Sequence, residues 1–135
     1  MRQQYITSGC IRIGKYPIQQ RLQHIFEGLS KVIEEYSPKA VAIERIFVHK
    51  NVSSALKLGQ ARGAAMVAAA VCGLTIAEYT ARQVKKSVVG YGAADKKQIQ
   101  HMMKVLLKLN GIPQVDAADA LAVAVCHGQT LMGVL

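Results

Sequence analysis

The sequence has few of the residues that build disulfide frameworks or transition-metal sites. Its three cysteines, Cys10, Cys72 and Cys126, lie far apart and form no C-x-x-C pair. The four histidines are equally scattered, and none has the spacing that places two metal ligands on one helical turn. We therefore expect neither a disulfide scaffold nor a cysteine or histidine metal site. This cysteine usage favours a reducing, cytoplasmic location.

Long apolar runs and acidic residues are also scarce. No uninterrupted stretch reaches the roughly 20 apolar residues that a membrane span needs. The first residues lack the charged-then-apolar order of a signal peptide, so we expect no membrane association. Asp and Glu number 8 against 17 Lys and Arg, which gives a formal charge of +9. Such an excess favours a polyanionic partner, with nucleic acid the foremost candidate.

The residues that are present suit one compact domain over 1–135. Hydrophobic residues make up 51% of the chain, enough to fill a core. Alternating residues at 5–13 predict a first, antiparallel strand, and short apolar runs at 40–43 and 75–79 predict buried parallel strands. Helical periodicity covers the segments between and after them, at 18–36, 53–72, 80–89, 95–107 and from 116 onward. This order predicts an α/β fold with a mixed sheet flanked by helices.

Three acidic residues have positions that suit metal chemistry. Glu44 ends a predicted strand, where sites gather in open α/β sheets. Asp116 and Asp119 are three residues apart at a predicted helix start, so they project from one face. Carboxylates of this kind suit Mg²⁺, which can assist phosphodiester hydrolysis. From spacing alone, an N-cap, a solvated first-turn acid and a strand-end residue are the alternative interpretations.

Four segments, in order along the chain, resemble successive motifs of the RuvC family of Holliday-junction resolvases. They are Val41-Ala-Ile-Glu-Arg-Ile-Phe, Asn51-Val-Ser-Ser-Ala-Leu-Lys-Leu-Gly-Gln-Ala-Arg-Gly, Tyr79-Thr-Ala-Arg-Gln-Val-Lys-Lys-Ser-Val-Val-Gly and Asp116-Ala-Ala-Asp-Ala-Leu-Ala. The resemblance implies a ribonuclease H-like fold and a homodimer that resolves four-way junction DNA by paired symmetric nicks in recombination and repair. A branch-migration helicase complex is a possible further partner.

The resemblance also implies a metal site. Glu44, Asp116 and Asp119 match three of the family's four acidic catalytic residues and would bind Mg²⁺, with Mn²⁺ as a possible substitute. The fourth belongs to a first strand with a motif close to Gly-Ile-Asp-Pro-Gly, and this motif is absent upstream of the Ser8-Gly9-Cys10 segment. We therefore expect an amino-terminally incomplete sheet and at most weak cleavage. The alternatives are a noncatalytic junction-binding or assembly module, and a related nuclease that acts on RNA or replication debris.

DNA contacts are predicted for an aromatic residue and two lysines. Phe47 lies just beyond Glu44 and would stack on an unpaired base at the junction, unless it folds back onto the core. Lys85 and Lys96 match family lysines near the scissile strand, while a solvated helix face is the alternative for either. The small residues of 53–72 permit close packing, either within the domain or at a dimer contact. For Glu78 we expect a structural role.

Overall fold

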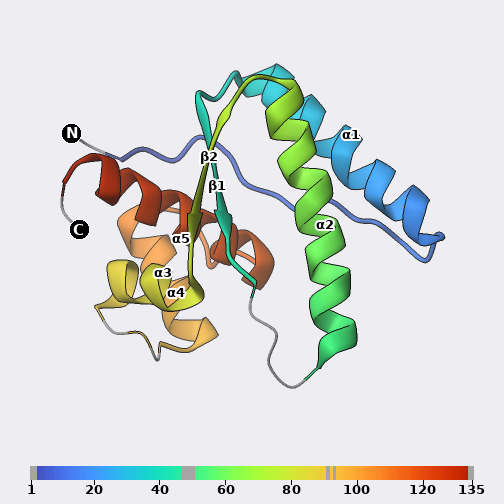
Figure 1. Cartoon of the computed structure of the whole chain (residues 1–135). Coiled ribbons are helices and arrows are strands. Elements are labelled where there is room, and N and C mark those ends of the chain that lie inside the picture. Colours follow the sequence, from blue (N-terminus) through green and yellow to red (C-terminus); the bar gives the residue numbers. More distant parts are fainter. Residues whose placement is uncertain (1–2, 47–50, 91, 93, 134–135) are drawn as a thin grey trace. The chain divides into compact units, whose positions relative to one another are not determined.

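The computed structural model describes residues 3–46, 51–90, 92 and 94–133. Its elements, in chain order, are α1 (Ile18–Tyr36), β1 (Ala40–Glu44), α2 (Val52–Val71), β2 (Thr75–Tyr79), α3 (Ala81–Val89), α4 (Lys96–Leu106) and α5 (Val115–Leu131) (Figure 1). The predicted α/β fold class is confirmed. No helix in these described ranges is long and apolar enough to cross a membrane.

The residues form two compact units. One unit comprises Met1–Cys10, Ala42–Arg45 and Glu78–Leu135, and the other comprises Ile11–Val41 and Ile46–Ala77. In the second unit α1 packs against α2 (Figure 1). The expectation of a single domain over 1–135 stays a prediction.

The core of the first unit lies among α3, α4 and α5. These helices contact one another, and Met103 and Cys126 are the largest side chains that are fully buried. Val84 and Val88 of α3 and Ile99 of α4 join the same cluster. A buried methionine or valine stabilises the fold by removing apolar surface from water. The core therefore holds together the three helices that, with the end of β1, form the site described below.

Side-chain caps fix where α3 and α4 begin. Thr80 accepts a hydrogen bond from the Gln83 N–H at 3.0 Å, and the Gln83 side chain accepts one from the Thr80 N–H at 2.8 Å. Asp95 and Gln98 form the same reciprocal arrangement at 2.8 Å in each direction. Each pair satisfies two N–H groups that have no partner within the helix. The helix starts near Lys85 and at Lys96 are consequently well defined.

The sheet pairs β1 with β2 in parallel (Figure 1). Beyond the end of β1, the Arg45 N–H donates to the Tyr79 carbonyl oxygen at 2.7 Å. The glutamate that ends β1 therefore lies next to a backbone contact with the end of β2.

The predicted strand at 5–13 is wrong, because the structure shows no strand there. Alternation predicts a backbone that is compatible with a strand, but a strand forms only where another strand supplies the ladder of hydrogen bonds. Part of this segment and the residues before it contact α5 instead. The Gln3 amide donates to the Val125 carbonyl at 3.2 Å, and the Cys10 thiol donates to the Gln114 side chain at 3.0 Å.

Candidate active site

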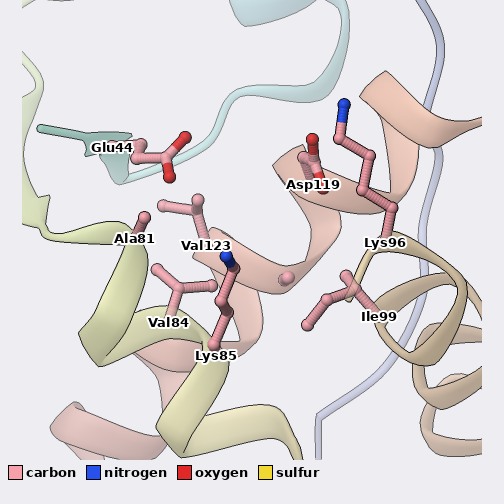
Figure 2. A pocket seen from close by; sticks show the side chains of 9 residues that line it. Glu44, Ala81, Val84, Lys85, Lys96, Ile99, Asp119 and Val123 are labelled. Atoms are coloured by element: carbon pink, nitrogen blue, oxygen red, sulfur yellow. The ribbon is translucent and has the colours of Figure 1, made fainter. Parts of the chain in front are cut away.

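A pocket in the first unit brings together charged side chains from four elements (Figure 2). Its lining comprises four charged residues, Glu44, Lys85, Lys96 and Asp119, and five apolar residues, Ala81, Val84, Ile99, Ala122 and Val123. The charged residues thus stand over an apolar surface built from the three core helices. Apolar walls of this kind strengthen the interactions among the charges, because they exclude part of the surrounding water.

Local structure explains why each charged group reaches the pocket. Glu44 is the last residue of β1, and Lys96 is the first residue of α4, directly after its Asp95 cap. Asp119 lies in the second turn of α5, on the stripe that also contains Ala122 and Val123. Positions three and four residues apart share one face of a helix, so these side chains line the pocket together.

Figure 2 shows the two carboxylates on opposite sides of the pocket, with Lys96 beside Asp119 and Lys85 reaching between them from α3. Both acids belong to the set predicted from the sequence, and both lysines were predicted to lie near the scissile strand. The pocket therefore contains two carboxylates and two ammonium groups close to one another. Carboxylates are suitable ligands for a cation, and lysines are suitable contacts for a phosphate.

Both carboxylates have a raised pKa. Partial burial raises the pKa of Glu44 most, the charge of Asp119 raises it further, and Lys85 lowers it in part. Burial is also the largest cause of the raised pKa of Asp119. Lys96 and Lys85 lower that pKa, whereas Asp116 raises it. The two lysines thus leave part of the negative charge uncompensated, and a bound cation would stabilise the ionised carboxylates.

Asp116 lies outside the pocket lining. It is exposed in the first turn of α5, and its carboxylate accepts a hydrogen bond from the Gln114 amide at 3.3 Å. Gln114, rather than Asp116, caps the helix by accepting from the Ala117 N–H at 3.1 Å. Asp116 still acts on the pocket electrostatically, because its charge raises the pKa of Asp119.

The donor set suits Mg²⁺ only with help from water. Among the residues that the structure describes, no group of three or more His, Cys, Asp or Glu side chains could hold a metal ion. Glu44 and Asp119 supply the hard carboxylate oxygens that Mg²⁺ prefers, and this ion is usually bound through one or two carboxylates with several waters retained. The chemistry of the pair suits such an ion, and metal binding by Glu44, Asp119 and Asp116 stays a prediction.

Two other predicted residues, Phe47 and Glu78, are not among the described residues that line the pocket. Phe47, the candidate for base stacking, lies outside the described residues. Glu78 does not line the pocket; its carboxylate forms an ion pair with Arg45, with 3.4 Å between Arg45 Nε and Glu78 Oε2. This contact agrees with the structural role expected for Glu78.

Sequence reasoning missed one polar contact between β2 and α5. The Tyr79 hydroxyl lies 2.7 Å from Nδ1 of His127, and the two rings are in tilted contact with centroids 5.7 Å apart. The residues are 48 positions apart, so no local spacing joins them. The only available signal was that His127 falls eight residues after Asp119, on the same stripe of a helix.

Comparison with known sequences gives strong matches along nearly the whole chain. Residues 1–127 match the family model described as Crossover junction endodeoxyribonuclease RuvC. A protein of that name from Pseudoalteromonas atlantica is 60% identical over 129 residues, covering 96% of this chain and 75% of the relative. Another from Shewanella frigidimarina is 57% identical over 135 residues, covering 99% of this chain and 78% of the relative. The chain thus spans about three quarters of these relatives.

Solved structures also resemble this fold. The structure of RuvC from Thermus thermophilus matches with a TM-score of 0.78 and 34% identity, covering 89% of this chain and 74% of that one. A structure of the same protein in complex with Holliday junction substrate matches with a TM-score of 0.81, at the same identity and coverage.

Proposed function

The chain belongs to the RuvC family of crossover junction endodeoxyribonucleases, and we propose that it resolves four-way DNA junctions by paired symmetric nicks in recombination and repair. The observation that carries this proposal is the pocket in which Glu44 and Asp119 lie with Lys85 and Lys96. Further support comes from the Thermus thermophilus relative, whose structure is described as a complex with Holliday junction substrate.

We propose that Glu44 and Asp119 bind Mg²⁺, or Mn²⁺ in its place, with Asp116 as a further ligand. A bound metal ion would lower the pKa of a water molecule and stabilise the charge that develops on the phosphate oxygens. The protein's own contribution is to place the two carboxylates in one partly buried pocket. Their raised pKa values support a cation site, because an ion would offset both the burial and the mutual repulsion.

The two lysines would hold the DNA strand that is cut. Lys85 and Lys96 line the same pocket as the acids, so a phosphate that approaches the carboxylates also approaches these positive charges. Phosphate contacts position DNA without reading its bases. The formal charge of +9 would strengthen the approach of the polyanion. Phe47, three residues beyond Glu44 in the sequence, remains a proposed base-stacking residue.

Two symmetric nicks require two equivalent sites, so we propose a homodimer. Support comes from α2, where the apolar side chains of Leu56, Val67 and Val71 are 65%, 53% and 70% exposed. Apolar side chains exposed along a helix suit a protein contact. Sedimentation at micromolar concentration measures the mass directly, and a folded species that stays monomeric would contradict this proposal. A branch-migration helicase complex remains a possible further partner.

The decisive experiment measures cleavage and binding separately. The parent chain, Asp119→Asn and the control Glu35→Gln are each incubated in excess over labelled junction, linear duplex or RNA–DNA hybrid, with and without Mg²⁺. Glu35 is an exposed acid on α1 and does not line the pocket. With protein in excess, we expect at most weak, Mg²⁺-dependent cutting of the junction by the parent and control, and loss of that cutting with retained junction binding in Asp119→Asn.

Each other result has a distinct meaning. Equal cutting by Asp119→Asn and the parent would contradict the assigned site. Selective junction binding without cutting by any of the proteins would favour a noncatalytic junction-binding module. Preferential cutting of the hybrid would favour a ribonuclease H-like enzyme with an RNA-containing substrate.

A further inference from the structure

Tyr79 contacts the residue that follows Glu44 and a residue of the helix that carries Asp119. Its carbonyl oxygen accepts a hydrogen bond from the Arg45 N–H at 2.7 Å, directly beside Glu44. Its hydroxyl lies 2.7 Å from Nδ1 of His127 in α5, the helix that carries Asp119. One residue at the end of β2 therefore joins the strand that supplies one acid to the helix that supplies the other.

The contact at His127 can control where Asp119 points. The two residues are eight positions apart within one uninterrupted helix, which corresponds to roughly 12 Å along its axis. Asp119, Val123 and His127 lie on one stripe of this helix, with positions four residues apart. Holding His127 against Tyr79 therefore restricts the rotation of α5 about its axis. Because a helix rotates as a rigid rod over two turns, the same contact restricts Asp119.

The hydroxyl of Tyr79 adds more than packing. The ring is partly buried and packs against the core cluster, so its apolar part already has partners. A phenylalanine would supply the same apolar surface without the contact to Nδ1. The next residue, Thr80, caps α3, the helix that carries Lys85. A shift at Tyr79 would thus reach a third charged group of the pocket.

We propose that Tyr79 is a positioning residue: its contacts with Arg45 and His127 set the separation of Glu44 and Asp119, and thereby the affinity of the pocket for a divalent cation. This inference deepens the proposed function and rests on it. Residues that hydrogen-bond directly to metal ligands typically change metal affinity or activity by about 10–100-fold when substituted. Because Tyr79 acts through α5, we expect Tyr79→Phe to weaken cation binding by about tenfold, at the lower end of that range.

The test uses Mn²⁺ as a probe in the absence of DNA. Free Mn²⁺ is counted by electron paramagnetic resonance during titration of the parent, Tyr79→Phe, His127→Leu and His127→Asn. Asn places an amide oxygen or nitrogen near the position of Nδ1 and can accept or donate, so His127→Asn should recover most of the affinity that His127→Leu loses. The Mg²⁺ concentration for half-maximal junction cleavage should rise in parallel, while cleavage at saturating Mg²⁺ changes less.

Tyr5→Phe is the matched control. Tyr5 also makes a hydroxyl contact, 2.9 Å from Ser8 Oγ, but this contact is exposed and lies outside the pocket lining. We expect Tyr5→Phe to bind Mn²⁺ like the parent. Thermal melts of all variants fix a titration temperature at which each is folded, so a loss of affinity cannot arise from unfolding.

The outcomes separate this inference from the proposed function. If Tyr79→Phe melts earlier but binds Mn²⁺ as tightly as the parent, Tyr79 is only structural and the inference is overturned. If Asp119→Asn loses Mn²⁺ in the same series, the proposed site survives that result. If Asp119→Asn and the parent bind Mn²⁺ equally, the proposed site fails and the inference fails with it.

Discussion

Removing the charge of Asp119 should stabilise the metal-free protein while it abolishes cutting. Partial burial and the charge of Asp116 raise the pKa of Asp119, so ionisation of this group costs free energy in the folded state. Asp119→Asn removes that cost and keeps the shape of the side chain. A loss of activity that accompanies a gain in stability is typical of sites whose charges are arranged for a ligand.

The expected gain is small. The nearby Lys85 and Lys96 offset part of the cost, and water reaches the side chain, so a screened interaction of about 0.5–1 kcal/mol is the appropriate scale. Unfolding entropy near 60 °C amounts to roughly 0.3 kcal/mol per kelvin for a chain of 135 residues. The melting temperature should therefore rise by about 2–4 °C.

The stability difference between Asp119→Asn and the parent should depend on pH, and the raised pKa of Asp119 fixes the direction of that dependence. A raised pKa means that the folded state holds the proton more tightly than the unfolded state. The free-energy cost of ionising Asp119 in the folded state is absent below the ordinary pKa of 3.8 and complete above the raised pKa of the folded state. The stability difference between Asp119→Asn and the parent should consequently be small near about pH 4 and grow as the pH rises toward neutrality.

Added Mg²⁺ should reverse the order of stability. An ion at about ten times its dissociation constant stabilises the parent by about 1.4 kcal/mol, whereas the variant gains little. Scanning calorimetry of both proteins and of Glu35→Gln, across pH and Mg²⁺ concentration, measures all three effects. A metal-free variant that melts below the parent at pH 8, or equal stabilisation of both by Mg²⁺, would refute this reasoning.

Three further predictions concern the elements that carry the site. Asp95→Ala should lower the free energy of unfolding by about 1 kcal/mol because α4 loses its cap, whereas Asp95→Asn should keep most of the stability that the cap provides. Thermal melts that show the same loss of stability in both variants would contradict the capping role. Met103 is 0% exposed, so Met103→Ala should lower the free energy of unfolding in urea by about 2–5 kcal/mol, and Met103→Leu by less than about 1.5. Lys85→Ala should reduce the salt slope of junction binding by roughly one unit, and Lys31→Ala on α1 should not; unchanged slopes in both would argue against a phosphate contact.

Much of the fold could be predicted because its signals are local. Pro17 and Pro38 enclose a regular apolar period, and α1 spans Ile18–Tyr36 as predicted. The run at 75–79 likewise forms β2. Caps were harder to predict, since several polar residues stand near each helix start: Asn51 caps α2 although Ser53 and Ser54 follow it, and Gln114 caps α5 although Asp116 follows it.

The candidate site was predictable in part, because local signals place each acid on its own element. Glu44 could be placed at a strand end from the apolar run before it, and Asp119 could be placed on a helix. Their meeting in one pocket depends on tertiary packing, and the sequence indicated it only through family resemblance. The exposure of Asp116 and the contact between Tyr79 and His127 depend on the rotation of α5, which helical periodicity does not define to that accuracy.

The two carboxylates of the pocket are distant along the chain, and this distance has a consequence for synthesis. Asp119 follows Glu44 by 75 residues. At about 5–20 residues per second, a ribosome adds the second acid roughly 4–15 s after the first. In the second half of that interval the ribosome adds the basic residues of α3 and α4, so these positive charges are made before the second acid. A nascent chain that ends just before Asp119 would therefore carry the proposed phosphate contacts Lys85 and Lys96 but lack one of the two proposed metal ligands.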